Sequence, residues 1–158
     1  MKLSIKDKAP NFSLSDQKNK KYALSDYRGT WVLLYFYPKD DTPGCTKEAC
    51  EMRDNFSAFE KSNAVVFGIS ADSAERHAVF AKKYNLDFSL LSDPDQKIIK
   101  LYGAWVKKKF MGREYMGIKR MSFLIDPKGV IQKIYDPVKP GLHAEEVLAD
   151  IEGFSLLR

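Results

Sequence analysis

The chain has 158 residues, of which 44% are hydrophobic and 30% are charged. A chain of about 150 residues buries roughly 70% of the surface that its unfolded form exposes, so it can build a core without disulfide or metal staples. The net charge is only +5, and apart from Lys107–Lys109 and Lys119–Arg120 the basic residues are scattered, which argues against nucleic acid as a partner.

The first elements in chain order are a small polar hairpin and a buried strand. Asn11–Ser15 and Lys21–Leu24 are predicted to pair around the turn-forming residues Asp16–Asn19. Trp31–Tyr37 follows as an unbroken run of apolar and aromatic residues, which is typical of a central strand covered on both faces.

The middle of the chain alternates helix and strand. Apolar residues recur at spacings of three and four from Pro43 to about Lys61, which predicts an amphipathic helix. Ala64–Ile69 is a second buried strand, and Ser70–Ser73 can cap a helix from about Ala74 to Tyr84. The remaining predicted elements are a strand at Phe88–Leu91, a helix at Pro94–Tyr102, strands at Met121–Ile125 and Val130–Tyr135, and a last helix at His143–Ile151.

This order predicts one α/β domain over residues 1–158, with helices packed on a mixed β-sheet. The first residues lack the apolar core of a signal peptide, and the longest apolar run is too short to span a bilayer. We therefore expect a soluble, cytoplasmic protein without a membrane partner. In a reducing compartment, cysteines are more often free, metal-binding or catalytic than permanently bridged.

Both cysteines, Cys45 and Cys50, lie five positions apart at the start of the predicted helix. Thr42 is a suitable N-cap and Pro43 a suitable first helical residue, so Cys45 falls within the first turn. There the unpaired backbone N–H groups of Gly44 and Cys45 and the helix dipole favour a thiolate and, with the Thr42 hydroxyl, can hold a small oxygen-rich substrate. The alternative is that Cys45 simply completes the apolar stripe, and the local context alone leaves both interpretations open.

Helix geometry separates the two thiols. Five helical positions place Cys50 roughly 140° around the axis from Cys45, with Cα atoms about 8 to 9 Å apart. This distance exceeds the limit of about 7 Å for a disulfide without backbone movement. Cys50 is therefore either an outward-facing bystander or a partner that is reached only when the first turns unwind.

Other chemistries fit the residues less well. A metal site would need the two cysteines with His77 and His143, which are distant in sequence, so we expect no metal. The ordinary interpretation makes His77 a surface residue and His143 a helix-start residue. A thioredoxin-type dithiol would have two residues between its cysteines, whereas four separate them here.

Pro38, Thr42 and Cys45 in "PKDDTPGC" match the signature of the peroxiredoxins, and "YFYPKDDTPGCTKEAC" resembles their bacterioferritin-comigratory, or Q-type, subfamily. The segments "APNFSLSD", "VVFGISADS", "FSLLSDPD" and "GIKRMSFLIDPKGVI" agree, so the resemblance covers nearly the whole chain. One departure is Met121, where a small or polar residue is common.

The resemblance implies a thioredoxin-like fold and a thiol peroxidase without metal or organic cofactor. Cys45 would attack the peroxide O–O bond and become a sulfenic acid. Thr42 and Arg120 would hold the peroxide, and Pro38 would shield the pocket from solvent. An arginine in an apolar strand context is costly to bury unless it meets an anion, although a surface arginine at a strand edge is the simpler alternative.

The same resemblance makes Cys50 the resolving cysteine, which would form an intramolecular disulfide with Cys45. Thioredoxin or a similar dithiol protein would then reduce this disulfide. Glu48 and Arg53 match polar positions near the arginine and the pocket, but a solvated helix face explains them equally well. A monomer is expected, with hydrogen peroxide and organic hydroperoxides as substrates in antioxidant defence.

Two alternatives remain at this stage. One is a thioredoxin-fold protein disulfide oxidoreductase. The other is a binding or chaperone-like module that uses the basic, aromatic segment Ala104–Gly117, which is otherwise an exposed loop or hairpin near the active site.

Overall fold

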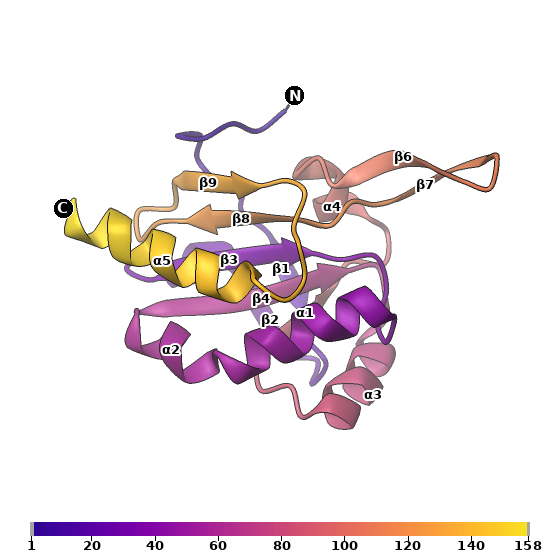
Figure 1. Ribbon diagram of the computed structural model, residues 1–158, viewed down its shortest axis with the longest axis horizontal. Coiled ribbons are helices and arrows are strands. Elements are labelled where there is room, and N and C mark those ends of the chain that lie inside the picture. Colours follow the sequence, from indigo (N-terminus) through magenta and orange to yellow (C-terminus); the bar gives the residue numbers. More distant parts are fainter. Residues whose placement is uncertain (1, 158) are drawn as a thin grey trace.

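The computed structural model describes residues 2–157, and most of its strands form one mixed sheet. The strand order is β2-β1-β5-β4-β3-β8-β9 (Figure 1). The strands are β1 (Ser13–Ser15), β2 (Lys21–Ala23), β3 (Trp31–Phe36), β4 (Ala64–Ser70), β5 (Ser89–Ser92), β8 (Met121–Ile125) and β9 (Ile131–Tyr135).

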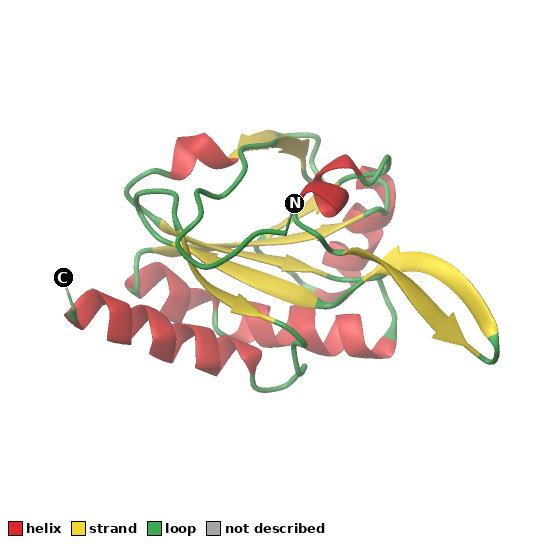
Figure 2. Cartoon of the chain, turned by 90° about the horizontal axis from the view of Figure 1, so that it is seen from above, coloured by secondary structure: helices red, strands yellow, loops and turns green. Residues whose placement is uncertain are grey.

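Helices cover both faces of this sheet, because the side chains of the buried strand β3 alternate between two cores. Leu33 and Tyr35 contribute to one core, whereas Val32, Leu34 and Phe36 contribute to the other. Figure 2 shows the sheet between these layers. The first core includes residues of α1 (Pro43–Asp54), α2 (Phe56–Lys61), α3 (Ala74–Tyr84) and α5 (His143–Leu156), and the second includes residues of α4 (Lys97–Leu101) and the 3-10 helix η1 (Leu24–Tyr27).

Strand direction brings two distant parts of the chain together at one edge of the sheet. β3, β4 and β5 are parallel, so the segments that follow them leave from the same edge. β8 is antiparallel to β3, and Phe36 pairs with Met121. Arg120, which immediately precedes β8, therefore lies beside the loop that connects β3 to α1.

The structure confirms the predicted N-terminal hairpin and strands, but it corrects three helices. The helix predicted from Pro43 to Lys61 breaks at Asn55, whose side chain donates to the Glu51 carbonyl at 2.9 Å and competes with helix hydrogen bonds. α4 begins only at Lys97, because Gln96 adopts a left-handed conformation with φ of 57°. α5 continues past Ile151 to Leu156, where Phe154 stacks on Trp31 with ring centroids 5.8 Å apart.

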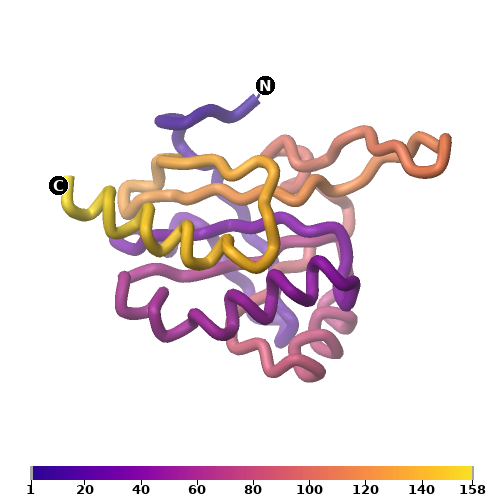
Figure 3. The backbone as a smooth tube through the Cα atoms, viewed as in Figure 1, coloured from indigo at the N-terminus to yellow at the C-terminus, as the bar shows by residue number. Residues whose placement is uncertain are grey.

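A separate two-stranded hairpin occupies most of the segment Ala104–Gly117, for which the sequence predicts an exposed loop or hairpin without strand bounds. It consists of β6 (Trp105–Phe110) and β7 (Arg113–Ile118) and extends away from the rest of the chain in the tube view of Figure 3. Phe110 and Met111 at its tip are 67% and 87% exposed. Because both faces carry exposed residues, the sequence lacks the alternation that identifies a half-buried strand.

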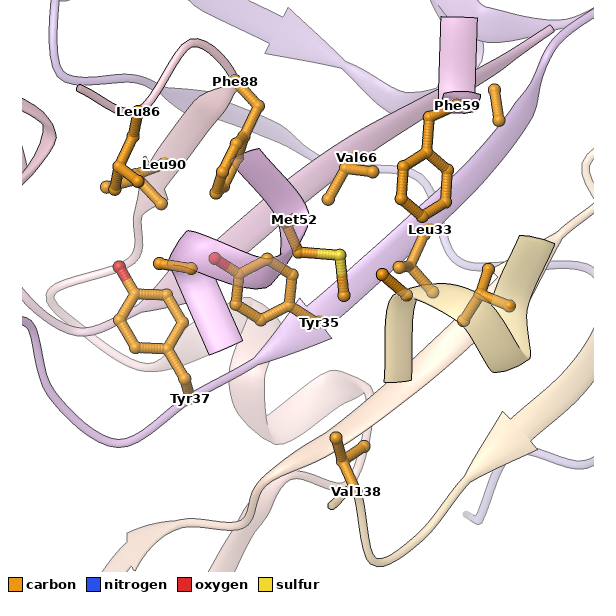
Figure 4. Packing of buried hydrophobic residues seen from close by; sticks show 14 of the residues in the cluster. Leu33, Tyr35, Tyr37, Met52, Phe59, Val66, Leu86, Phe88, Leu90 and Val138 are labelled. Atoms are coloured by element: carbon orange, nitrogen blue, oxygen red, sulfur yellow. The ribbon is translucent and has the colours of Figure 1, made fainter. Parts of the chain in front are cut away.

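Aromatic side chains fill the core beneath the β3–α1 loop. Tyr35 and Tyr37 lie with ring centroids 5.5 Å apart, and Figure 4 shows both near Phe88 and Leu90. Tyr35 pairs with Gly68 of β4, and a Cβ atom at Gly68 would lie 2.7 Å from the tyrosine ring. A glycine is thus required for this packing.

Within residues 2–157, every helix is too short or too polar to cross a bilayer.

Candidate active site

Cys45 lies in the first turn of α1, and its side chain is buried, with the residue only 2% exposed. Arg120 reaches it from the start of β8 and donates from Nη2 to Sγ at 3.0 Å. Gly44 lies against the same guanidinium, since a Cβ atom there would approach Nη2 to 3.1 Å. The cysteine, glycine and arginine proposed from the sequence therefore meet in space.

Glu48 lies one turn after Cys45 and holds the other side of Arg120. Its Oε1 accepts a hydrogen bond from Nη1 at 2.8 Å, and the residue is fully buried. Burial raises the pKa of Glu48 to about 7, although Arg120 acts to lower it. Oε2 of Glu48 has no hydrogen-bond partner among the described residues. The free-energy cost of burying an ionised carboxylate is therefore only partly offset at this side chain. A solvated helix face is thus the wrong explanation for Glu48.

The charge on Arg120 is shared between two acidic groups. Partial burial opposes that charge, but Cys45 and Glu48 outweigh it and raise the arginine pKa. Arg120 lies just before the strand rather than on it, and it is half-buried, so a surface arginine at a strand edge is also wrong. Burial and the charge of Arg120 lower the pKa of Lys108, which lies on the β6–β7 hairpin. Lys108 lies within the run Lys107–Lys109, so no sequence signal distinguishes it from its neighbours.

Thr42 and Pro38 lie in the loop that leads to Cys45. Thr42 occupies the N-cap position, but its side chain does not cap the helix as predicted. Its hydroxyl donates to the Lys39 carbonyl at 2.9 Å, because the loop turns that oxygen toward it. The oxygen of the hydroxyl can still accept a hydrogen bond. Pro38 is half-buried directly after the buried Tyr37.

Cys50 and Arg53 face other surroundings. Cys50 is a free, half-buried thiol, and Cys45 is also unbridged. Arg53 donates to the Tyr84 carbonyl at 2.7 Å and to Asp54 at 3.0 Å. The side chain of Arg53 therefore extends toward the end of α3 and does not join Arg120.

His77 is buried, which contradicts its interpretation as a surface residue. Its Nδ1 lies 2.6 Å from Oδ2 of Asp40, and its Nε2 lies 3.2 Å from the Leu91 carbonyl. Tyr37 donates to the other carboxylate oxygen of Asp40 at 2.6 Å. These contacts fix the β3–α1 loop to α3. The spacing from His77 to Phe80 and Ala81 places it on the apolar face of the helix, a signal that was available in the sequence.

His143 is the first residue of α5, as predicted, and it is also buried. Its Nε2 lies 2.9 Å from the Ser122 hydroxyl, and its ring packs edge-on against Tyr135. Burial lowers the pKa of His143. The two histidines thus contact groups other than the cysteines.

The amino-acid sequence is similar to those of known proteins. The model of the AhpC/TSA family matches residues 5–134. Peroxiredoxin Bcp of Bacillus subtilis is 44% identical over 98% of this chain and 99% of its own, and peroxiredoxin Bcp of Escherichia coli K12 is 47% identical over 92% and 94%. The chain belongs to the AhpC/TSA family, as a peroxiredoxin of the Bcp/PrxQ group. It is a thiol peroxidase, and its cysteines at positions 45 and 50 are consistent with an intramolecular disulfide mechanism.

Solved structures show that this peroxiredoxin has the expected thioredoxin-like α/β fold. A cysteine-to-serine mutant of PrxQ from Xylella fastidiosa has a TM-score of 0.92 and 35% identity, covering 98% of this chain and 99% of that one. Bacterioferritin comigratory protein from Xanthomonas campestris has a TM-score of 0.86 and 33% identity, covering 90% and 91%. Family membership favours the peroxidase over the disulfide oxidoreductase and the binding module.

Proposed function

We propose that this peroxiredoxin reduces hydrogen peroxide and organic hydroperoxides by a cycle in which Cys45 is oxidised and Cys50 resolves the product. The observation that carries this proposal is the contact of 3.0 Å between Arg120 and Sγ of Cys45, inside a first helical turn. Organic substrates are included because the similar bacterioferritin comigratory protein of Xanthomonas campestris has alkyl peroxide reduction activity.

In the first step, the Cys45 thiolate attacks the terminal oxygen of the peroxide. A sulfur–oxygen bond forms, the O–O bond breaks, and the leaving oxygen takes a proton to depart as water or an alcohol. The peroxide oxygens are held by Arg120 and by the first-turn N–H groups of Gly44 and Cys45. The Thr42 oxygen accepts a hydrogen bond from the O–H group of the peroxide. Glu48 orients Arg120, and Pro38 limits access of bulk water to the sulfur.

In the second step, Cys50 attacks the Cys45 sulfenic acid. The S–S bond forms, the S–O bond breaks, and water leaves with the thiol proton. Thioredoxin or a similar dithiol protein supplies the two electrons that reduce this disulfide. The protein acts as a monomer, since both thiols belong to one helix and a single chain can complete the cycle. Because its reductant must stay reduced, we place it in a reducing compartment, the cytoplasm.

The test is peroxide consumption coupled to thioredoxin, thioredoxin reductase and NADPH. We expect Cys45→Ser to abolish turnover, while Cys50→Ser retains the first reduction of peroxide but recycles slowly with thioredoxin. The intact wild-type protein should lose two hydrogens in mass after an equimolar amount of peroxide. A Cys45→Ser protein that keeps its rate would refute the peroxidase assignment. Rapid insulin reduction without peroxide would instead support a general disulfide oxidoreductase.

A further inference from the structure

Glu51 follows Cys50 in α1 and binds the beginning of a different helix. Its carboxylate accepts a hydrogen bond from the Gly141 N–H at 2.6 Å and another from the Ala144 N–H. The N-cap position of α5 is Leu142, whose side chain cannot accept a hydrogen bond. Glu51 therefore supplies a cap from another helix and places negative charge at the positive end of α5.

Other contacts hold the same part of α1. Arg53 donates to the carbonyl of Tyr84, the last residue of α3, at 2.7 Å. Met52, between Glu51 and Arg53, is 1% exposed and packs in the core. The part of α1 that begins directly after Cys50 is thus attached to two helices and to the core.

The segment before the nucleophile is held just as firmly. The buried Asp40 contacts His77 at 2.6 Å, and its N–H donates to Asp72 at 2.9 Å. The next residue, Asp41, accepts hydrogen bonds from the side chains of Lys83 and Tyr84. Both sides of the short segment from Thr42 to Cys50 are therefore anchored.

Within that segment, Cys45 and Glu48 contact the same cation, Arg120. Oxidation adds an oxygen to Sγ of Cys45, so the contact of 3.0 Å between this sulfur and Nη2 of Arg120 has to rearrange. The contacts of Glu51 do not involve the sulfur. Oxidation should therefore loosen the segment while the anchors on both sides persist.

We propose that Glu51 is a positioning residue for the resolving step. It holds the backbone next to Cys50 against α5, so that unwinding stops at residue 50 and Cys45 moves toward a Cys50 whose backbone is held on its C-terminal side. A fixed partner raises the probability that the sulfenic acid meets the thiol before a second peroxide does. This inference rests on the proposed disulfide between Cys45 and Cys50.

The first experiment is hydrogen–deuterium exchange measured by mass spectrometry on the reduced and the peroxide-oxidised protein. In the wild type, oxidation should raise exchange in residues 42–50 and leave residues 52–61 and 141–147 protected. In Glu51→Ala, oxidation should raise exchange in all three segments. If residues 141–147 of the wild type lose protection on oxidation, the hydrogen bonds from Gly141 and Ala144 to Glu51 break during the cycle, and the inference is wrong.

The second experiment is rapid quenching with mass spectrometry at increasing peroxide. Glu51→Ala should slow disulfide formation by about fivefold or more, the effect expected for loss of a helix cap, and raise the overoxidised fraction of Cys45. Glu51→Gln, which retains one acceptor oxygen, should fall between Glu51→Ala and the wild type. Glu60→Ala, at an exposed position on α2, is the matched control and should behave as the wild type.

The rate constant for the first step, reaction of Cys45 with peroxide, should be the same in all these variants. General destabilisation would lower the rate constant of the first step, which needs the folded site, so a loss confined to disulfide formation identifies positioning. Faster or unchanged disulfide formation in Glu51→Ala would overturn the inference while leaving the proposed function intact. Absence of any Cys45–Cys50 disulfide in the wild type would overturn both.

Discussion

Arg120 donates hydrogen bonds to two acidic groups, each from a different guanidinium nitrogen. Nη2 contacts Sγ of Cys45 at 3.0 Å, and Nη1 contacts Oε1 of Glu48 at 2.8 Å. A planar guanidinium with several fixed N–H donors can do this, whereas a lysine ammonium offers a point charge without fixed directions. The position of this one planar group therefore determines the electrostatics around Sγ of Cys45.

Gly44 controls where that planar group lies, so Gly44→Ala should separate activity from stability. An added Cβ would approach Nη2 to 3.1 Å and displace the guanidinium by a few tenths of an ångström. We expect the rate constant of Cys45 with peroxide to fall about three- to tenfold, because catalytic contacts are sensitive to small displacements. The free energy of unfolding should stay equal or rise, since alanine favours a helix by up to about 1 kcal/mol.

Gly153→Ala is the matched control for this variant. Gly153 lies in α5, where an added Cβ meets no atom within 4 Å, so this change should stabilise the helix and leave the peroxide rate unchanged. Stopped-flow kinetics and urea unfolding measure the two quantities. A Gly44→Ala protein with the wild-type rate would contradict the close packing of Gly44 against Arg120.

At the scale of elements, the proposed disulfide between Cys45 and Cys50 requires α1 to change shape. The two cysteines lie roughly 140° apart around the helix axis, and their Cα atoms in a regular helix are about 8 to 9 Å apart, too far for a disulfide. Oxidation of the wild type should therefore reduce helical circular dichroism at 222 nm by about one to two helical turns. Cys50→Ser, which cannot form the bridge, should keep the reduced spectrum after the same treatment. A wild-type disulfide without loss of helical signal would exclude unwinding.

Local sequence signals predicted the helix start, because Thr42 and Pro43 act within a few positions of it, but they left Cys45 open between a nucleophile and a packing residue until the family resemblance was added. Pairings between distant residues were harder to predict. Glu48 was suggested only by the family resemblance, and Arg53, suggested in the same way, contacts α3 instead. The spacing of His77 to Phe80 and Ala81 indicates that it is buried, but its partner Asp40 lies 37 positions away, so the contact itself could not be predicted from the local sequence.

At the scale of the whole molecule, Glu48 should make stability depend on pH. Its pKa in the folded protein is about 7, above the ordinary value of 4.5, so the folded state binds the proton more tightly than the unfolded state. The resulting stabilisation is fully present below about pH 4.5 and is lost as the pH rises through about 7. The difference in unfolding free energy between wild type and Glu48→Gln should fall by up to about 3 kcal/mol over this window.

Urea unfolding of both proteins from pH 4.5 to 8, under reducing conditions, measures this difference. Glutamine is the appropriate reference because it keeps an acceptor for Arg120 and stays neutral throughout. A difference that does not change with pH would show that Glu48 is ionised throughout this range, with its charge fully compensated by Arg120.

The pairing of Phe36 with Met121 makes the active site depend on chain length as well as on side chains. A slip of one residue along β8 would turn each of its side chains to the opposite face and carry Arg120 away from the sulfur. A single inserted residue between Ile118 and Arg120 should thus be far more damaging than most substitutions there. At the exposed tip, Phe110–Gly112, extra residues can loop out without altering that pairing. The hairpin tip is consequently the natural place for an inserted label or tag.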